Sequence, residues 1–139
     1  MALAAVLWGA QTSMAAPAAS ASPKPMDENQ FWSLVEQAKA QAGVDLDQRP
    51  QALEKRLVAL PLESIQAFQR RYEQLLLKAN TWKLWAAAYV MNGGCSDDGF
   101  RYFRDWLISE GRALFERAVK DPDALSAVPR RESFDLESF

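Results

Sequence analysis

The sequence predicts an all-α fold: a single compact bundle of five to six helices behind a disordered N-terminal extension. From residue 26 onward, apolar residues recur every three or four positions, as they do along the buried face of a helix. These runs are separated by Gly or Pro, and no segment alternates apolar and polar residues as a half-buried strand does. The chain has 139 residues, a length that suits one domain with tails.

The chain divides into three parts. Residues 1–25 are rich in Ala, Ser and Pro and carry no charged side chain before Lys24, so we expect a disordered extension. The alternative is a secretory signal peptide with the small residues 19–21 as its cleavage site. Residues 26–127 are the expected helical domain, and residues 128–139 a loosely held tail. The first interpretation predicts a cytoplasmic protein, whereas a signal peptide predicts an exported one.

The first two helices are predicted from their end signals. Asp27 is placed to cap a helix whose apolar residues continue at helical spacing until Gly43 ends it. A second, shorter helix has Pro50 in its first turn, extends to Leu60 and is ended by Pro61.

The third and fourth helices are predicted from their apolar stripes. The third begins near Leu62, and its core-facing residues are Ile65, Phe68, Tyr72, Leu75 and Ala79. The fourth covers residues 82–91 behind a cap at Asn80 or Thr81. Its wide face holds Trp82, Trp85, Ala86, Tyr89 and Val90. The small residues 86–88 would let another helix approach closely.

A tight turn should lead from the fourth helix into the fifth. Gly93 and Gly94 end one helix and Ser96 caps the next, which continues to Lys120 with a kink or break near Gly111. Residues 121–125, DPDAL, restart a turn or short helix. We assign a structural role in the turn and the core to Gly93, Gly94, Cys95, Phe100, Phe103 and Trp106.

The polar residues of this turn are the candidate ligand or partner site: Ser96, Asp97, Asp98, Arg101 and Arg104. Paired carboxylates can bind a hard cation or divide into acid and base roles. The structural alternative is that both acids stabilise a helix N-terminus, with an i, i+4 ion pair from Asp97 to Arg101. A further alternative is an anion clamp formed by Arg101, Arg104 and Arg112.

Composition excludes several classes of function. The chain has no His and a single Cys, which removes imidazole catalysis, His-activated nucleophiles and Cys or His metal sites. With a net charge of -2 and no long basic run, it lacks the charge pattern of a nucleic-acid-binding protein. No apolar run reaches the roughly 20 residues that span a bilayer. We expect no metal, no cofactor and no integral membrane insertion.

A family resemblance rests on three segments, FWSLVEQAK, LWAAAYVMNGGCSDDGFRYFRDWLISEGRALFERA and DPDAL. They resemble the bacterial domain-of-unknown-function family numbered 4240, which carries the motif GGCSDDGFxYFRxWLI. The resemblance covers roughly Met26 to Leu125 and implies that the domain begins at Met26. It implies no activity, cofactor or catalytic residue.

Three functions remain open at this point. The first is a non-enzymatic interaction module that binds an unknown protein partner or a small ligand. The second is a carboxylate-dependent hydrolase or transferase that uses Asp97 or Asp98 with Arg104. The third is a structural or oligomerising protein, which would expose an apolar patch on the fourth or fifth helix.

Overall fold

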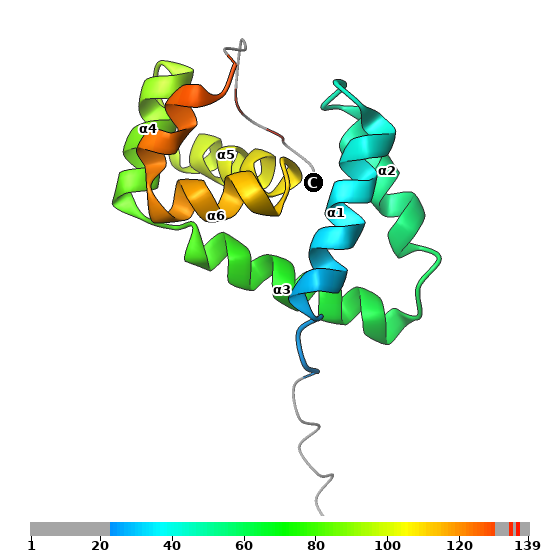
Figure 1. The fold of residues 1–139 in the computed structure, drawn as a ribbon. Coiled ribbons are helices and arrows are strands. Elements are labelled where there is room, and N and C mark those ends of the chain that lie inside the picture. Colours follow the sequence, from blue (N-terminus) through cyan, green and yellow to red (C-terminus); the bar gives the residue numbers. More distant parts are fainter. Residues whose placement is uncertain (1–22, 130–133, 135, 137–139) are drawn as a thin grey trace, which may run out of the picture.

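The computed structural model describes residues 23–129 together with Phe134 and Leu136, and every statement below concerns this part of the chain. It contains six α-helices, one 3₁₀ helix and no strand among these residues, which confirms the predicted all-α fold (Figure 1). The elements are α1 (Glu28–Ala42), α2 (Gln48–Leu57), α3 (Leu62–Lys78), α4 (Trp82–Asn92), α5 (Asp97–Ser109), α6 (Arg112–Lys120) and η1 (Pro122–Ala127).

The helices form two groups joined by α3 (Figure 1). On one side, α1 and α2 pack together as a hairpin. On the other side lie α4, α5, α6 and η1, with η1 against both α6 and α4. The long helix α3 passes below both groups and contacts α1 and α5. None of the described helices has the length and apolar composition needed to cross a membrane.

The predicted helix ends are largely confirmed. The Asp27 carboxylate accepts hydrogen bonds from the backbone N–H groups of Asn29 and Gln30, at 2.9 and 3.3 Å, and so caps α1. Helix α2 ends at Leu57 rather than at Leu60. A residue before proline is driven out of the helical conformation, and here the chain leaves the helix early, ahead of Pro61.

The long fifth helix of the prediction is two helices. Helix α5 ends at Ser109 and α6 starts at Arg112, so the break expected near Gly111 is confirmed. Gly111 has a φ of 96°, a left-handed conformation that favours glycine. A Cβ there would also lie 3.3 Å from the side chain of Glu36 on α1, so the break lets α1 approach closely.

Aromatic residues dominate the core between the two groups. Phe31 stacks on Phe68 with ring centroids 4.6 Å apart, and Trp32 packs on Phe115 at 5.3 Å. Trp106 is fully buried. Phe134, from the C-terminal tail, meets the Trp106 ring edge to face at 5.0 Å.

Two anchors in the tail are described. Phe134 and Leu136 are 3% and 5% exposed, and their backbone N–H groups donate to the Asn92 side chain and the Tyr102 carbonyl, at 2.9 and 3.1 Å. The rest of residues 130–139 and residues 1–22 of the predicted extension (residues 1–25) lie outside the described residues. The expectations for the extension and for most of the tail therefore stay predictions.

The wide face of α4 points outward. Its buried residues are Leu84 and Ala88, whereas Trp82, Tyr89 and Val90 are 79%, 58% and 76% exposed. Because apolar residues occur around most of the circumference of this helix, its sequence period does not determine which face is buried. Tyr89, which belongs to the predicted wide face, is therefore a surface residue.

Candidate functional site

The Gly-Gly turn has the predicted construction. Gly93 closes α4 with a φ of 68°, and the Gly94 N–H donates to the Tyr89 carbonyl at 2.9 Å. The Ser96 hydroxyl accepts the Gly99 N–H at 3.1 Å, which confirms Ser96 as the cap of α5. The turn is thus accounted for by helix geometry.

Asp97 and Asp98 are both exposed in the first turn of α5. Neither lines one of the two clefts described below, and the described residues hold no group of three or more potential Asp, Glu or Cys metal ligands. The predicted ion pair from Asp97 to Arg101 is wrong, because Arg101 pairs with Asp105 instead, its Nε lying 3.1 and 3.2 Å from the two carboxylate oxygens. The partner of Arg101 is thus the buried Asp105, which lies one helical turn after Arg101 on α5.

Arg104 is turned toward the end of α3. Its Nη1 donates to the Leu76 carbonyl at 3.0 Å, and its guanidinium carbon lies 4.6 Å from the centre of the Phe100 ring. Burial, followed by the positive charge of Arg101, lowers its pKa from the ordinary arginine value. Its described contacts tie α5 to α3 and involve neither Asp97 nor Asp98.

The predicted arginine clamp does not form either. Arg112 belongs to the junction of α6 with α1, where its Nε bonds Glu116 at 2.7 Å and its Nη1 bonds Asn29 at 2.9 Å. Glu116 raises the pKa of Arg112 above its ordinary value. Arg101, Arg104 and Arg112 therefore each have different partners.

Cys95 shows no sign of an activated thiol. Burial and the neighbouring Asp97 charge raise the pKa of the Cys95 thiol, which favours the unreactive protonated form. Its carbonyl accepts the indole N–H of Trp85 at 3.3 Å. The residue acts as a packing and anchoring element of the turn.

A buried acid that sequence reasoning missed lies two turns further along α5. Asp105 is 4% exposed and accepts hydrogen bonds from the Tyr72 hydroxyl and from Arg101. Burial raises the pKa of the Asp105 carboxyl, although the bonds from Tyr72 and Arg101 act in the opposite direction. Burial and the Asp105 charge also raise the pKa of Tyr72, so its hydroxyl keeps its proton and donates. The i, i+4 spacing from Arg101 was the available sequence signal.

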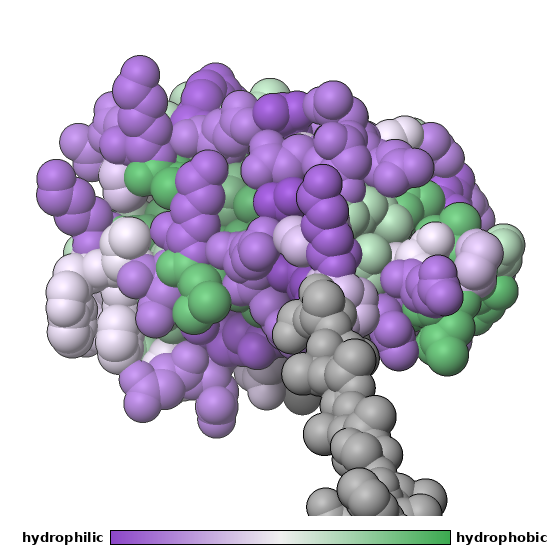
Figure 2. All heavy atoms as spheres, turned by 90° about the horizontal axis from the view of Figure 1, so that it is seen from below, coloured by the Kyte–Doolittle hydropathy of each residue, from purple (hydrophilic) through white to green (hydrophobic). Residues whose placement is uncertain are grey.

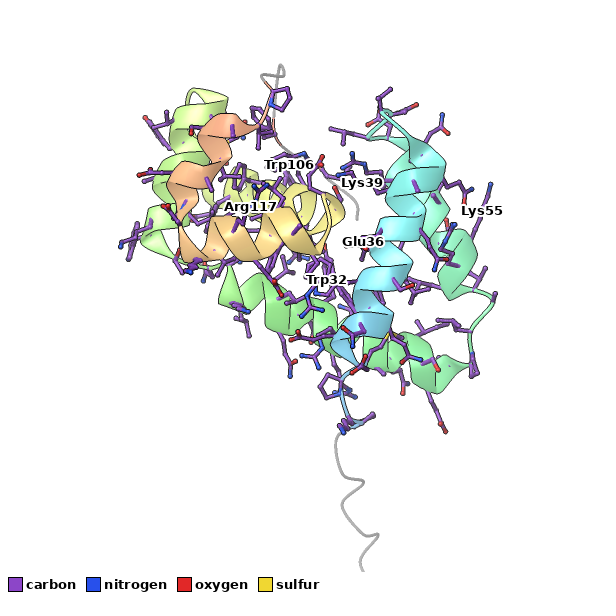
Figure 3. The ribbon with its side chains drawn as sticks, in the orientation of Figure 1. Trp32, Glu36, Lys39, Lys55, Trp106 and Arg117 are labelled. Atoms are coloured by element: carbon purple, nitrogen blue, oxygen red, sulfur yellow. The ribbon has the colours of Figure 1, made fainter. Side chains whose placement is uncertain are left out.

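A second missed group joins three helices. Glu110 bonds Lys39 of α1 at 2.7 Å and Arg49 of α2 at 2.8 Å, and Arg49 also donates to the Ser109 hydroxyl at 2.9 Å. Figure 3 shows Lys39 on the side of α1 that faces α5, whereas Lys55 lies on the outer side of α2. Arg49 is only 2% exposed. We call this group, Lys39, Arg49, Ser109 and Glu110, the structural clasp, because it joins the α1–α2 hairpin to the end of α5.

The aromatic rings at the start of α4 form a ladder. Trp82 stacks on Trp85 at 5.2 Å with 4° between the ring planes, and Trp85 stacks on Phe100 at 5.3 Å with 10° between the planes. Arg104 covers the Phe100 ring at the inner end. The ladder connects the buried core to Trp82 on the surface.

A groove lies between α4 and η1. It has a volume of about 540 Å³, and its apolar lining comes from Ala86, Ala87, Val90, Met91, Pro122 and Leu125. Four charged side chains border it: Lys83, Lys120, Asp121 and Asp123. A smaller cleft of about 410 Å³ lies along α1 beside Arg112, and most of the residues that line it are polar. Of the two, only the α4 groove adjoins exposed large apolar residues of the same helix.

A comparison with known protein families confirms the resemblance. Residues 26–139 match the model of a family described as "Protein of unknown function (DUF4240)". The chain belongs to this family. The match begins at Met26, as the resemblance implied, and continues beyond Leu125 to the last residue. No curated protein and no solved structure matches the chain. The match therefore gives a boundary for the domain and assigns it no activity.

Proposed function

We propose that this DUF4240 chain is a non-enzymatic interaction module that binds a protein partner through the α4 surface. This name denotes the exposed face of α4, with Trp82, Tyr89 and Val90, together with the α4–η1 groove. The observation that carries the proposal is the high exposure of three large apolar side chains on one helix, at 79%, 58% and 76%. Contiguous apolar surface of this kind marks interaction sites.

The composition of α4 supports the proposal. A helix that is apolar around most of its circumference is usually enclosed on most sides. In α4 only Leu84 and Ala88 are buried, whereas the large apolar Trp82, Tyr89 and Val90 are exposed. Removing a large apolar side chain from water contributes on the order of 1.5–3 kcal/mol. A partner on the outer face would supply the missing cover.

The stacked rings of the ladder restrict the conformation of Trp82 before any partner binds. Because its ring already rests on Trp85, and Trp85 is held by the Cys95 carbonyl, little side-chain freedom is lost when a partner covers it. Trp and Tyr are also the residues that most often dominate binding energy at interfaces.

A second apolar area at the α2–α3 connection is a weaker candidate. Figure 2 shows hydrophobic surface at this end of the molecule, where Val58 and Leu62 are 70% and 69% exposed. Neither of these residues lines a described cleft, and the area offers no exposed aromatic ring. The carboxylate-dependent hydrolase or transferase gains no support, since Arg104 is engaged with α3 and the two acids of the turn are exposed.

Site-specific photocrosslinking tests the proposal. A benzoylphenylalanine is placed at Val90, and the matched control carries it at Val44, a valine that is 92% exposed in the α1–α2 turn. After irradiation in the producing cells, the position-90 protein should form a defined protein adduct and the position-44 protein should not. Equal adducts from both positions, or none from either, would contradict the proposal.

A further inference from the structure

We infer that the α4 surface is covered by a second copy of this chain. The inference rests on the proposed function and names its partner. It follows from the charges and the shape of the surface, which complement themselves under a twofold rotation.

The charges around the groove are balanced and available. Lys83 and Lys120 are two cations, and Asp121 and Asp123 are two anions. None of the ion pairs among the described residues uses any of these four side chains. If the charged side chains around the groove all had the same sign, the expected partner would carry the opposite charge. A border with both signs in equal number, none of them in an ion pair among the described residues, can complement a copy of itself.

The shape is also self-complementary. In a twofold interface the same patch lies on both sides, so each protrusion needs a depression beside it on the same molecule. Helix α4 supplies both: Trp82 and Tyr89 are large and exposed, and the small, exposed Ala86 lies between them on the same helical face, at the edge of the groove. A twofold rotation would bring a large ring of each copy against Ala86 of the other.

Sedimentation velocity of the full chain over a range of concentrations tests the pairing. The unmodified protein should show a concentration-dependent dimer, and Val90→Arg should raise the dissociation constant at least about tenfold, because it places a charge in the apolar contact. Val44→Arg is the matched control and should behave as the unmodified chain. A protein that stays monomeric at every concentration, or a Val90→Arg dimer of unchanged affinity, would overturn the inference.

Charge exchange tests the complementarity of the border. Lys83→Glu/Lys120→Glu makes the border acidic, and Asp123→Lys makes it basic, while Asp121 is kept because it caps η1. Each variant alone should dimerise more weakly than the unmodified chain, and an equimolar mixture should recover dimers that contain one of each. Far-ultraviolet circular dichroism verifies that both variants are folded. No recovery in the mixture would refute the charge pairing.

The two proposals fail in different ways. If the position-90 crosslinker yields an adduct with twice the chain mass and the protein dimerises, both stand. If the protein is monomeric and the adduct contains a different protein, the interaction module stands and the second copy is refuted. If no adduct forms and the protein is monomeric, both are refuted.

Discussion

Tyr72 on α3 donates a hydrogen bond to Asp105 on α5 inside the core, and Arg101 holds the other side of the same carboxylate. This contact joins the helix that passes below both groups to the helix that carries the family motif. The carboxylate accepts from two donors, which is the condition under which a buried acid is tolerated. Asp105 is therefore the first residue to substitute in a test of what stabilises the packing of α3 against α5.

Asp105→Asn should destabilise the protein by about 1–2 kcal/mol, because an amide NH₂ replaces one of the two buried oxygens that accept hydrogen bonds from Tyr72 and Arg101. The loss should depend on pH. A carboxyl whose pKa is raised by burial binds its proton more tightly when folded, so its contribution is complete below the ordinary Asp pKa, about 3.9, and is lost as pH rises through the folded value. The advantage of the unmodified chain should shrink from acid toward neutral pH in urea titrations.

Glu110→Ala should have the larger effect at neutral pH, about 3 kcal/mol, since Arg49 stays buried without its partner. Burial raises the pKa of Glu110, but the hydrogen bonds and charges of Lys39 and Arg49 outweigh it and lower the pKa. Its contribution is therefore present above the ordinary Glu pKa and lost as pH falls through the folded value.

The surface acid Glu116 is the matched control for Glu110. It bonds Arg112 in an exposed i, i+4 pair, so Glu116→Ala should cost less than about 1 kcal/mol. The same urea series measures both variants. Equal losses from Glu110→Ala and Glu116→Ala, or a Glu110→Ala loss that grows in acid, would contradict the structural clasp.

The sequence predicted these helices well, but it did not indicate the clasp. Caps and breakers act locally, so Asp27, Ser96 and Gly111 were recognisable from their neighbours along the chain. Arg49 and Glu110 are distant in sequence and meet only when α2 packs near the end of α5. The same limit applies to α4, where apolar residues around most of the helix gave no indication of which face would be covered.

Ser96→Ala should cost about 1 kcal/mol, because the Gly99 N–H loses its side-chain acceptor. Asp97→Asn/Asp98→Asn should cost less than about 1 kcal/mol, since exposed acids in a first turn contribute only a weak dipole term. Denaturant unfolding of both variants gives the comparison. A gain in stability for the double variant would instead point to acids kept for binding at a stability cost.

On the α4 surface, a substitution should weaken binding without lowering the free energy of unfolding. Val90 is 76% exposed, so Val90→Arg should change the free energy of unfolding of the monomer by less than about 0.5 kcal/mol. Leu84→Ala, on the covered face of the same helix and fully buried, should cost about 2–4 kcal/mol. Denaturant unfolding at a concentration below dimer formation measures both. A large loss for Val90→Arg would mean that this face packs within its own chain.

Phe134→Ala tests how firmly the C-terminal tail is held. The sequence favours a loose tail, yet Phe134 is 3% exposed and packs edge to face on Trp106, which is itself fully buried. Removing the ring should leave a cavity over the Trp106 indole and cost about 3 kcal/mol in denaturant unfolding. Val44→Ala, on the exposed α1–α2 turn, should change stability by less than about 0.5 kcal/mol. If Phe134→Ala also costs less than that, the tail is loosely held, and the core of the domain is complete without it.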